Sequence, residues 1–225
     1  MEKVDYSKTT DTPLPLRQYT RLTLILSDPQ QNYGINNSNN EVVQSYDIIA
    51  VQPETERMFQ SACTNLDVDI ISLDLNSRLS FPVKAGYLRQ ALSRGISFEV
   101  LYSPLVADAT ARRNIIANLR NILRLALGKG KRRAGEGGLF ISSGGEATWQ
   151  YRAPADVLNL ASLMGVPAHL RKACLVDIPE AVFIHAATRK HTHRGAVAII
   201  PPQASYEDKR RANTSDMLDD FISFK

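Results

Sequence analysis

Five short runs of apolar residues recur along the chain and predict the strands of one sheet. They are RLTLILS (Arg21–Ser27), DIIAV (Asp47–Val51), DIISLD (Asp69–Asp74), FEVLY (Phe98–Tyr102) and LFISS (Leu139–Ser143). The runs are continuous and rich in Ile, Leu and Val, which is typical of parallel strands that are covered on both faces. The pattern therefore predicts a parallel β-sheet.

Amphipathic helical patterns lie between most of these runs. PETERMFQSACTNL follows the second strand, and its Pro53 suits the first position of a helix. After Ser143 the pattern becomes helical in ADVLNLASLMG, PAHLRKACLV and PEAVFIHAATRK, where Gly165 suits a helix end and Pro167 a helix start. Alternating strands and helices predict an α/β fold with right-handed crossovers, either a β/α barrel or an open sheet.

The flanking segments divide the chain into three parts. Residues 1–19 form a polar leader, residues 20–200 one β/α barrel-like domain, and residues 201–225 a flexible polar tail. Within the domain, QQNYGINNSNN (residues 30–40) is typical of a disordered polar insertion. Five strands are few for a closed barrel of this type.

Composition narrows the class of protein. The chain has 225 residues and contains no run of 18 or more apolar residues, so we expect no membrane span. The N-terminus lacks the apolar core of a signal peptide. Cys63 and Cys174 lie in helical patterns without metal-ligand spacing, and we expect both to be buried thiols.

Charge is distributed unevenly along the sequence. Residues 84–172 carry 14 Lys and Arg against 5 Asp and Glu, a balance of +9, whereas residues 1–83 carry 6 against 11, a balance of −5. Either the middle block is an ordinary solvated surface or it binds a polyanion. Such a concentrated positive field favours a nucleic acid.

One predicted helix, Ala109–Leu127, concentrates this charge. At 100° per residue its apolar stripe contains Ile115, Leu119 and Ile122. Arg113, Arg120 and Arg124 fall on the opposite face, where they serve either solubility or binding. Arg112 lies near the apolar stripe, toward the strand end, so we expect it to meet a bound anion or an internal carboxylate.

The helix continues into the basic, glycine-rich segment GKGKRRAGEGG, residues 128–138. The segment matches neither GxxxxGK[ST] nor GxGxxG, so it does not predict a nucleotide cradle. Lys129, Lys131, Arg132 and Arg133 on such a tether suit contacts with a phosphate backbone. A basic import signal or a simple disordered linker remains the alternative.

The expected strand ends lack a set of catalytic groups. None of the four histidines lies at such an end: His169 and His185 fall in helical patterns, and His191 and His193 lie among cations that would repel a metal ion. SSGGE (Ser142–Glu146) is not a nucleophile elbow. We therefore predict no catalytic residues, no metal ligands and no cofactor.

Several of these segments together resemble one known family. YDIIAVQPETERMFQSACTNLDVDIISLDL, FEVLYSPLVADATARRN, LFISSGGE, RAPADVLNL and IHAATRK are similar, in the same order, to segments of the thirty-kilodalton protein subunit of eukaryotic nuclear ribonuclease P and ribonuclease MRP. The resemblance runs from about Arg21 to about Ile200. It implies a PHP-like, TIM-type β/α barrel, related to metal-dependent phosphoesterases but without their metal ligands.

The resemblance also implies a function and a set of RNA-binding residues. The family's subunit is a noncatalytic RNA-binding scaffold of the particle that processes the 5′ leader of tRNA and rRNA precursors. Its partners are the catalytic RNA, a small α/β protein subunit and other protein subunits, in the nucleus and nucleolus. By position the family's paired arginines fall on Arg112 and Arg113, its R-x-P-x-D-V arginine on Arg152, and its basic C-terminal motif on Arg189 and Lys190.

The sequence departs from the family in one respect that concerns the fold. Family members begin with two further strands before the strand at Arg21, where this chain has the polar leader. Either the chain is incomplete at its N-terminus or its barrel is open. Two other functions remain as alternatives: a metal-dependent phosphoesterase of the parent fold, and a sugar-phosphate enzyme that uses the SSGG turn as an anion nest.

Overall fold

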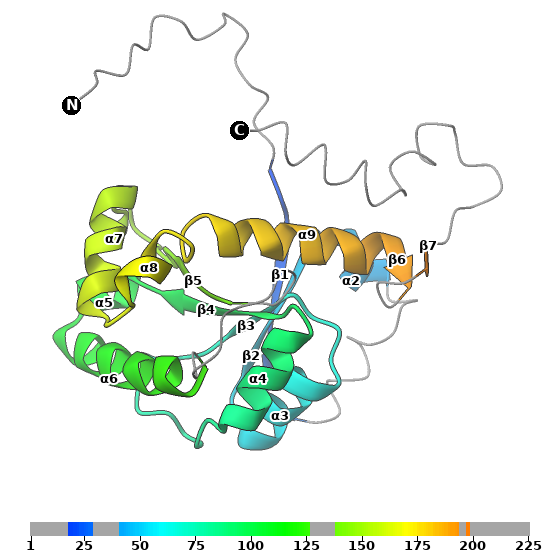
Figure 1. The fold of residues 1–225 in the computed structure, drawn as a ribbon, viewed down its shortest axis with the longest axis horizontal. Helices are drawn as coiled ribbons and strands as arrows, with labels where there is room; N and C mark the ends of the chain where they lie inside the picture. Colours follow the sequence, from blue (N-terminus) through cyan, green and yellow to red (C-terminus); the bar gives the residue numbers. More distant parts are fainter. Residues whose placement is uncertain (1–17, 29–40, 127–137, 194–196, 199–225) are drawn as a thin grey trace, which may run out of the picture.

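A five-stranded parallel sheet forms the centre of the molecule (Figure 1). The computed structural model describes residues 18–28, 41–126, 138–193 and 197–198. The strands are β1 (Arg21–Leu26), β2 (Ile48–Pro53), β3 (Ile70–Ser72), β4 (Ser97–Leu101) and β5 (Leu139–Ser142), and they lie in chain order across the sheet. All four neighbouring pairs are parallel. The five strands and the parallel topology predicted from the sequence are confirmed.

Helices lie on both sides of this sheet (Figure 1). They are α2 (Glu41–Ser45), α3 (Glu56–Thr64), α4 (Ala85–Ser93), α5 (Ser103–Ala107), α6 (Ala109–Ala126), α7 (Pro154–Leu163), α8 (Ala168–Arg171) and α9 (Asp177–His191), with a 3-10 turn η3 (Thr148–Gln150). Helices α3, α4 and α6 follow one side, and the long α9 runs along the other. A short antiparallel pair, β6 (Thr192–His193) and β7 (Val197–Ala198), follows α9 and was not predicted.

The predicted start of the first long helix was wrong by three residues. Pro53 is the last residue of β2, paired with Leu26 of β1, rather than the first residue of a helix. Helix α3 begins at Glu56, and Thr55 caps it by accepting a hydrogen bond from the backbone N–H of Met58 at 3.3 Å. The threonine side chain therefore fixes the helix start, as N-capping residues commonly do.

Burial along the strands separates the interior of the sheet from its first edge. All of β3 is buried, as is all of β2 except the partly buried Gln52, because helices cover both faces. In β1 the pattern alternates instead, and the side chain of Ile25 is 57% exposed. We expected β1 to be covered on both faces, and this expectation was wrong: the alternation leaves the face that carries Thr23 and Ile25 exposed among the described residues.

The sheet is open within the described residues. β1 pairs with β2 and β5 pairs with β4, and these two outer strands do not pair with each other. Of the two expectations, a closed barrel and an open one, the described strands therefore support the open one. The predicted leader, insertion and tail fall almost entirely on residues 1–17, 29–40 and 199–225, which lie outside the described residues.

An ion pair between the first and the fourth strand shows that the sheet is strongly curved. Two nitrogens of Arg21 on β1 donate to the two carboxylate oxygens of Glu99 on β4, both at 2.5 Å. Neighbouring strands lie about 4.8 Å apart, so in a flat sheet β1 and β4 would be separated by roughly 14 Å. Because side chains stand nearly perpendicular to a sheet, a direct contact requires the sheet to curl toward the face that carries Arg21 and Glu99.

Glu99 remains ionised although its side chain is buried. Burial by itself raises the pKa of this carboxyl, but the bonds from Arg21, Ser142 and Ser72 outweigh burial and hold the pKa below its usual value. The Ser142 hydroxyl donates to Glu99 at 2.7 Å. The curved sheet thus encloses a charged carboxylate that needs its partner Arg21, whose side chain stays partly exposed.

Removing one partner of this pair should destabilise the fold. We expect Arg21→Ala to lower the free energy of unfolding by about 3 kcal/mol, because Glu99 would stay buried without a counter-charge. Urea denaturation at pH 7 measures this. The double substitution Arg21→Met with Glu99→Leu should recover most of the loss, since apolar residues of similar volume can replace a buried pair. A loss in the double variant as large as in Arg21→Ala would contradict this explanation.

The same pair predicts a dependence on pH. A carboxyl whose pKa is lowered in the folded state stabilises the fold above its ordinary value, here 4.5, and loses that contribution as the pH falls through the folded value. The stability difference between the wild-type chain and Arg21→Ala should therefore shrink between pH 7 and pH 3. An unchanged difference across that range would exclude Glu99 as its source.

Candidate nucleic-acid interface

Arg112 braces the corner between helices α5 and α6 at the carboxyl end of β4. Its Nε donates to the carbonyl oxygen of Leu105 at 2.8 Å, and a terminal nitrogen lies 3.4 Å from the carbonyl oxygen of Val106. Asp108, between the two helices, caps α6 by accepting from the N–H of Ala111 at 2.6 Å. This N–H bond holds the pKa of Asp108 below its usual value, and the charge of Arg112 adds to the effect. Part of Arg112 is therefore used to hold the backbone, although the residue remains exposed.

The two faces of α6 are divided as the sequence predicts. Ile115, Leu119 and Ile122 are buried in the core, and α6 is helical from the predicted start at Ala109 to Ala126, where the described segment ends. Exposed arginines occupy the outer face: Arg113, Arg120 and Arg124. Arg124 donates to the side chain of Asn121 at 3.2 Å. The outer face of α6, defined by these three arginines, is called the α6 arginine face below.

Arg152 lies in the segment between β5 and α7, beside α5. Its backbone N–H donates to the Tyr102 hydroxyl at 3.1 Å. One guanidinium nitrogen donates to the carbonyl oxygens of Trp149 at 2.6 Å and Tyr151 at 2.9 Å. Pro154 begins α7. The arginine is exposed, and it shares the carboxyl end of the sheet with Arg112.

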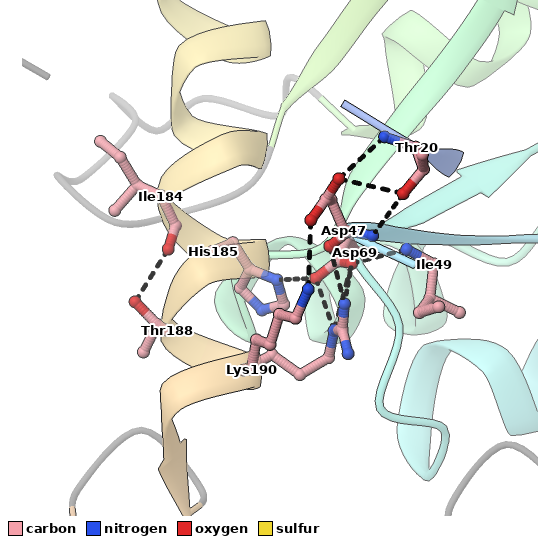
Figure 2. Close-up of polar contacts among 9 residues, drawn as sticks. Thr20, Asp47, Ile49, Asp69, Ile184, His185, Thr188 and Lys190 are labelled. Carbon is pink, nitrogen blue, oxygen red and sulfur yellow. Dashed lines mark hydrogen bonds and ion pairs between the residues drawn. The ribbon is translucent and has the colours of Figure 1, made fainter. Parts of the chain in front are cut away.

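Arg189 is placed differently, inside the molecule. Figure 2 shows the cluster in which α9 meets the residues that precede β2 and β3. Two nitrogens of Arg189 donate to Asp69, the shortest contact being 2.9 Å, and the Nδ1 of His185 lies 2.8 Å from the same carboxylate. The side chain of Asp69 is fully buried, and that of Arg189 is 5% exposed. Burial raises the pKa of Asp69, but bonds from His185, Arg189 and the N–H of Ile49 lower it below its usual value.

Lys190 completes this cluster at the surface. Its Nζ donates to Asp47 at 3.1 Å, and both side chains are about one third exposed. The same carboxylate accepts from the backbone N–H and the hydroxyl of Thr20, which lies just before β1. The Thr20 N–H is the main reason that the pKa of Asp47 lies below its usual value. The last long helix is thus tied to the start of three strands.

The predicted RNA-binding residues therefore lie at two opposite ends of the sheet. Arg112, Arg113 and Arg152 follow the carboxyl ends of β4 and β5, whereas Arg189 and Lys190 meet residues at the amino ends of the strands. Direct RNA contact by Arg189 does not fit its burial, because its guanidinium is enclosed and bound to Asp69. The remaining four predicted residues, Lys129, Lys131, Arg132 and Arg133, lie outside the described residues.

Sequence analysis did not identify the acidic partners of this cluster. Asp47 and Asp69 each precede a strand directly, and His185 and Arg189 are four residues apart on α9. That spacing places His185 and Arg189 on one face of a helix, and it could have predicted that the two side chains share a partner. The burial of Asp69, by contrast, could not be predicted from local sequence, because it depends on how α9 crosses the sheet.

A small cavity opens at the carboxyl ends of β2 and β3. It has a volume of about 240 Å³ and is lined by polar residues that include Gln52, Glu54, Asp74 and Arg78. The loop after β3, which lines part of the cavity, is attached to α6. Asn118 of this helix donates to the carbonyl oxygens of Leu75 and Ser77 at 3.1 and 2.8 Å. The parts of the chain that the structure describes bring no three His, Cys, Asp or Glu side chains together as a metal site.

Two further sequence expectations can be compared with the structure. Cys63 and Cys174 are buried thiols outside any disulfide, as predicted, and burial raises the pKa of Cys63 to about 12. Among the described helices, none has the length and apolar character needed to cross a membrane.

Comparisons with known proteins agree with the sequence resemblance. Residues 3–191 match the family described as RNase P subunit p30. The chain is 35% identical over 194 residues to the mouse ribonuclease P protein subunit p30, covering 86% of this chain and 69% of the mouse protein. It is 31% identical over 179 residues to the probable ribonuclease P protein subunit 3 of Schizosaccharomyces pombe, covering 80% of this chain and 71% of that protein.

A solved structure has a similar fold. A chain in the cryo-EM structure of archaeal ribonuclease P with mature tRNA superimposes with a TM-score of 0.61 at 20% sequence identity, covering 85% of this chain and 79% of that chain. The parallel sheet with its flanking helices is thus a fold that also occurs in a ribonucleoprotein particle. The chain belongs to the ribonuclease P subunit p30 family.

The two neighbouring basic residues of α9 should behave differently when they are replaced. We expect Arg189→Ala to lower the free energy of unfolding by about 3 to 5 kcal/mol, because Asp69 would keep a buried charge without its partner. Lys190→Ala should cost at most about 1 kcal/mol, since it removes a partly exposed pair. Urea denaturation of the two variants measures both effects. Wild-type stability for Arg189→Ala together with weakened RNA binding would contradict the internal role of Arg189.

Proposed function

We propose that this chain is a noncatalytic protein subunit of ribonuclease P and ribonuclease MRP, where it binds and holds the catalytic RNA. The observation that carries the proposal is the exposed α6 arginine face on a chain of the p30 family. In such a particle the RNA cleaves the precursor and the protein supplies counter-charge for the folded polynucleotide. Processing of tRNA 5′ leaders and of rRNA precursors is the role that follows.

The α6 arginine face suits the phosphates of a folded RNA. Arg113 and Arg120 lie on an 18-residue helix, so their charges are presented at regular spacing along a rigid axis. A guanidinium group can bind a phosphate through two parallel hydrogen bonds, and its charge does not depend on pH in the physiological range. Contacts of this kind position a protein on RNA without reading bases.

Arg112 and Arg152 extend the same surface to the carboxyl ends of the strands. Each already donates to backbone carbonyls, and these bonds fix the direction of the guanidinium group. An arginine held in this way loses less conformational freedom on binding than a fully mobile one. We assign both residues to RNA or partner contact, with Lys129, Lys131, Arg132 and Arg133 as further phosphate contacts after α6.

Arg189 and Lys190 serve a different purpose in this proposal. Both make ion pairs within the chain that attach α9 to the amino ends of β2 and β3. We assign them to the integrity of the domain, with Lys190 alone exposed enough to reach a partner. The proposed partners are the particle's RNA, a small α/β protein subunit and the other protein subunits, in the nucleus and nucleolus.

RNA that co-purifies with the chain tests the assignment to a particle. When the tagged chain is isolated from its own cells and the bound RNA is sequenced, one or two structured noncoding RNAs should dominate. A chain recovered without RNA, or with the cell's messenger RNAs in proportion to their abundance, would contradict the proposal.

The salt dependence of RNA binding tests the basic segment after α6. Replacing Lys129, Lys131, Arg132 and Arg133 by Gln should flatten the plot of log affinity against log salt concentration. The slope should change by roughly 0.7 to 0.9 for each phosphate that the variant no longer neutralises, because fewer counterions are released on binding. Arg89→Gln is a single-charge control, since this exposed arginine lies on α4 and is not among the proposed contacts. An unchanged slope in the fourfold variant would show that the segment is only a linker.

A further inference from the structure

Two large aromatic side chains next to Arg152 are exposed and are not used by the phosphate contacts proposed above. Trp149 is 59% exposed and Tyr151 is 52% exposed. They lie two residues apart, in the η3 turn and just after it. Single exposed apolar residues are common on protein surfaces, but two exposed aromatic residues so close in sequence are less usual.

The backbone under these rings is held by side-chain hydrogen bonds. The side-chain oxygen of Gln150 accepts from the N–H groups of Glu146 at 2.8 Å and Ala147 at 3.1 Å, which closes the loop. Arg152 fastens the other side by donating to the carbonyl oxygens of Trp149 and Tyr151. The segment is therefore fixed before any ligand arrives.

The ring of Tyr151 is itself anchored. Its hydroxyl donates to the carbonyl oxygen of Gly145 at 2.9 Å. A Cβ placed on Gly145 would lie 3.5 Å from a ring carbon of Tyr151, so the ring packs against the glycine backbone. The hydroxyl end of the ring is thus held at Gly145, and more than half of the residue remains open to solvent. A ring held in this way can accept a stacked group with little further loss of freedom.

On the proposed function the ligand of this segment is RNA, and the side chains present suit a nucleobase. Gly145–Asp156 contains no Leu, Ile, Val or Met, so its large apolar side chains are aromatic rings. Exposed aromatic rings next to an arginine can stack unpaired bases, because every base offers an aromatic face and arginine can add a cation–π contact. Bases in a duplex are already stacked and are not available.

We propose that Trp149 and Tyr151 form a stacking platform for unpaired bases of the bound RNA, with Arg152 beside it. This inference rests on the proposed function and adds the part of the RNA that is recognised: a single-stranded loop or bulge. The segment also carries Glu146 and Asp156, so the platform attracts RNA through its rings rather than through net charge. The platform adjoins α5 through the bond from Arg152 to Tyr102, and α5 leads directly to the α6 arginine face.

The chain provides its own probe for this proposal, because Trp149 is its only tryptophan. The 225-residue chain is titrated with an RNA of about eight nucleotides that has no secondary structure. This length lies within the site sizes of known single-strand-binding domains. The fluorescence emission of Trp149 is recorded at each RNA concentration. Binding is followed in parallel by the anisotropy of a fluorescent label on the RNA. Stacking predicts saturable quenching that follows the binding curve and changes little with salt. A duplex of the same length should bind through its phosphates without quenching.

Variants of Tyr151 and Trp149 refine the measurement. Tyr151→Leu should weaken binding of the single strand by about tenfold, the order expected for the loss of one stacked ring. Tyr151→Phe is the matched control, since it keeps the ring and should bind within about twofold of the wild-type chain. Trp149→Leu should weaken anisotropy-detected binding by a similar factor. Circular dichroism verifies that each variant is folded.

The possible failures are distinct. RNA that binds by anisotropy without quenching, or a duplex that quenches as strongly as the single strand, would overturn the platform and leave the proposed function intact. Quenching by the particle's protein subunits but not by RNA would also overturn it, and would assign the rings to a protein interface. Absence of any RNA binding, together with no co-purified RNA, would overturn the proposed function itself.

Discussion

Buried carboxylates paired with arginines hold the described fold together. Glu99 is enclosed by the curved sheet and is neutralised by Arg21, which lies on β1 although the carboxylate belongs to β4. Asp69 is enclosed where β3 begins and is neutralised by Arg189 from α9. Each pair joins segments far apart in the sequence, 78 residues in one case and 120 in the other. An unpaired charge at either place would be costly, so the curvature of the sheet and the position of α9 are both fixed by electrostatics as well as by apolar packing.

This requirement separates two sets of arginines. Arg21 and Arg189 each bind a buried carboxylate, and Arg189 is itself buried. The second set consists of the α6 arginine face together with Arg112 and Arg152, which are exposed; Arg112 and Arg152 also brace the backbone. Three of its members, Arg112, Arg113 and Arg152, lie toward the carboxyl ends of the strands, the edge at which open α/β sheets commonly bind their ligands. A protein that binds RNA there can keep its internal charges satisfied whether or not RNA is present.

Much of the fold could be predicted because its signals are local. The apolar runs marked the strands, and the stripe of Ile115, Leu119 and Ile122 marked the buried face of α6. Gly165 adopts a φ of +89° after α7, as a helix-ending glycine should. Pro53 was misplaced because proline suits both a helix start and the end of a strand, and its pairing with Leu26 decides between the two.

The candidate site was predictable only in part, because a residue's role depends on burial. Arg112 and Arg189 look alike in sequence, yet the first lies on an exposed corner and the second on the buried side of α9. Family resemblance marked both as RNA-binding, and the buried partner Asp69 separates them. Trp149 and Tyr151 were not singled out, since aromatic residues are usually buried and their exposure depends on the turn between β5 and α7.

The central claim is that this protein holds RNA while the RNA performs the cleavage. The most direct test is to isolate the particle through the tagged chain and assay the removal of the 5′ leader from a precursor tRNA, before and after micrococcal nuclease digests the bound RNA. The account predicts leader removal by the intact particle, complete loss after digestion, and no cleavage by the purified chain with Mg²⁺. Cleavage that survives digestion and follows the purified chain would contradict it.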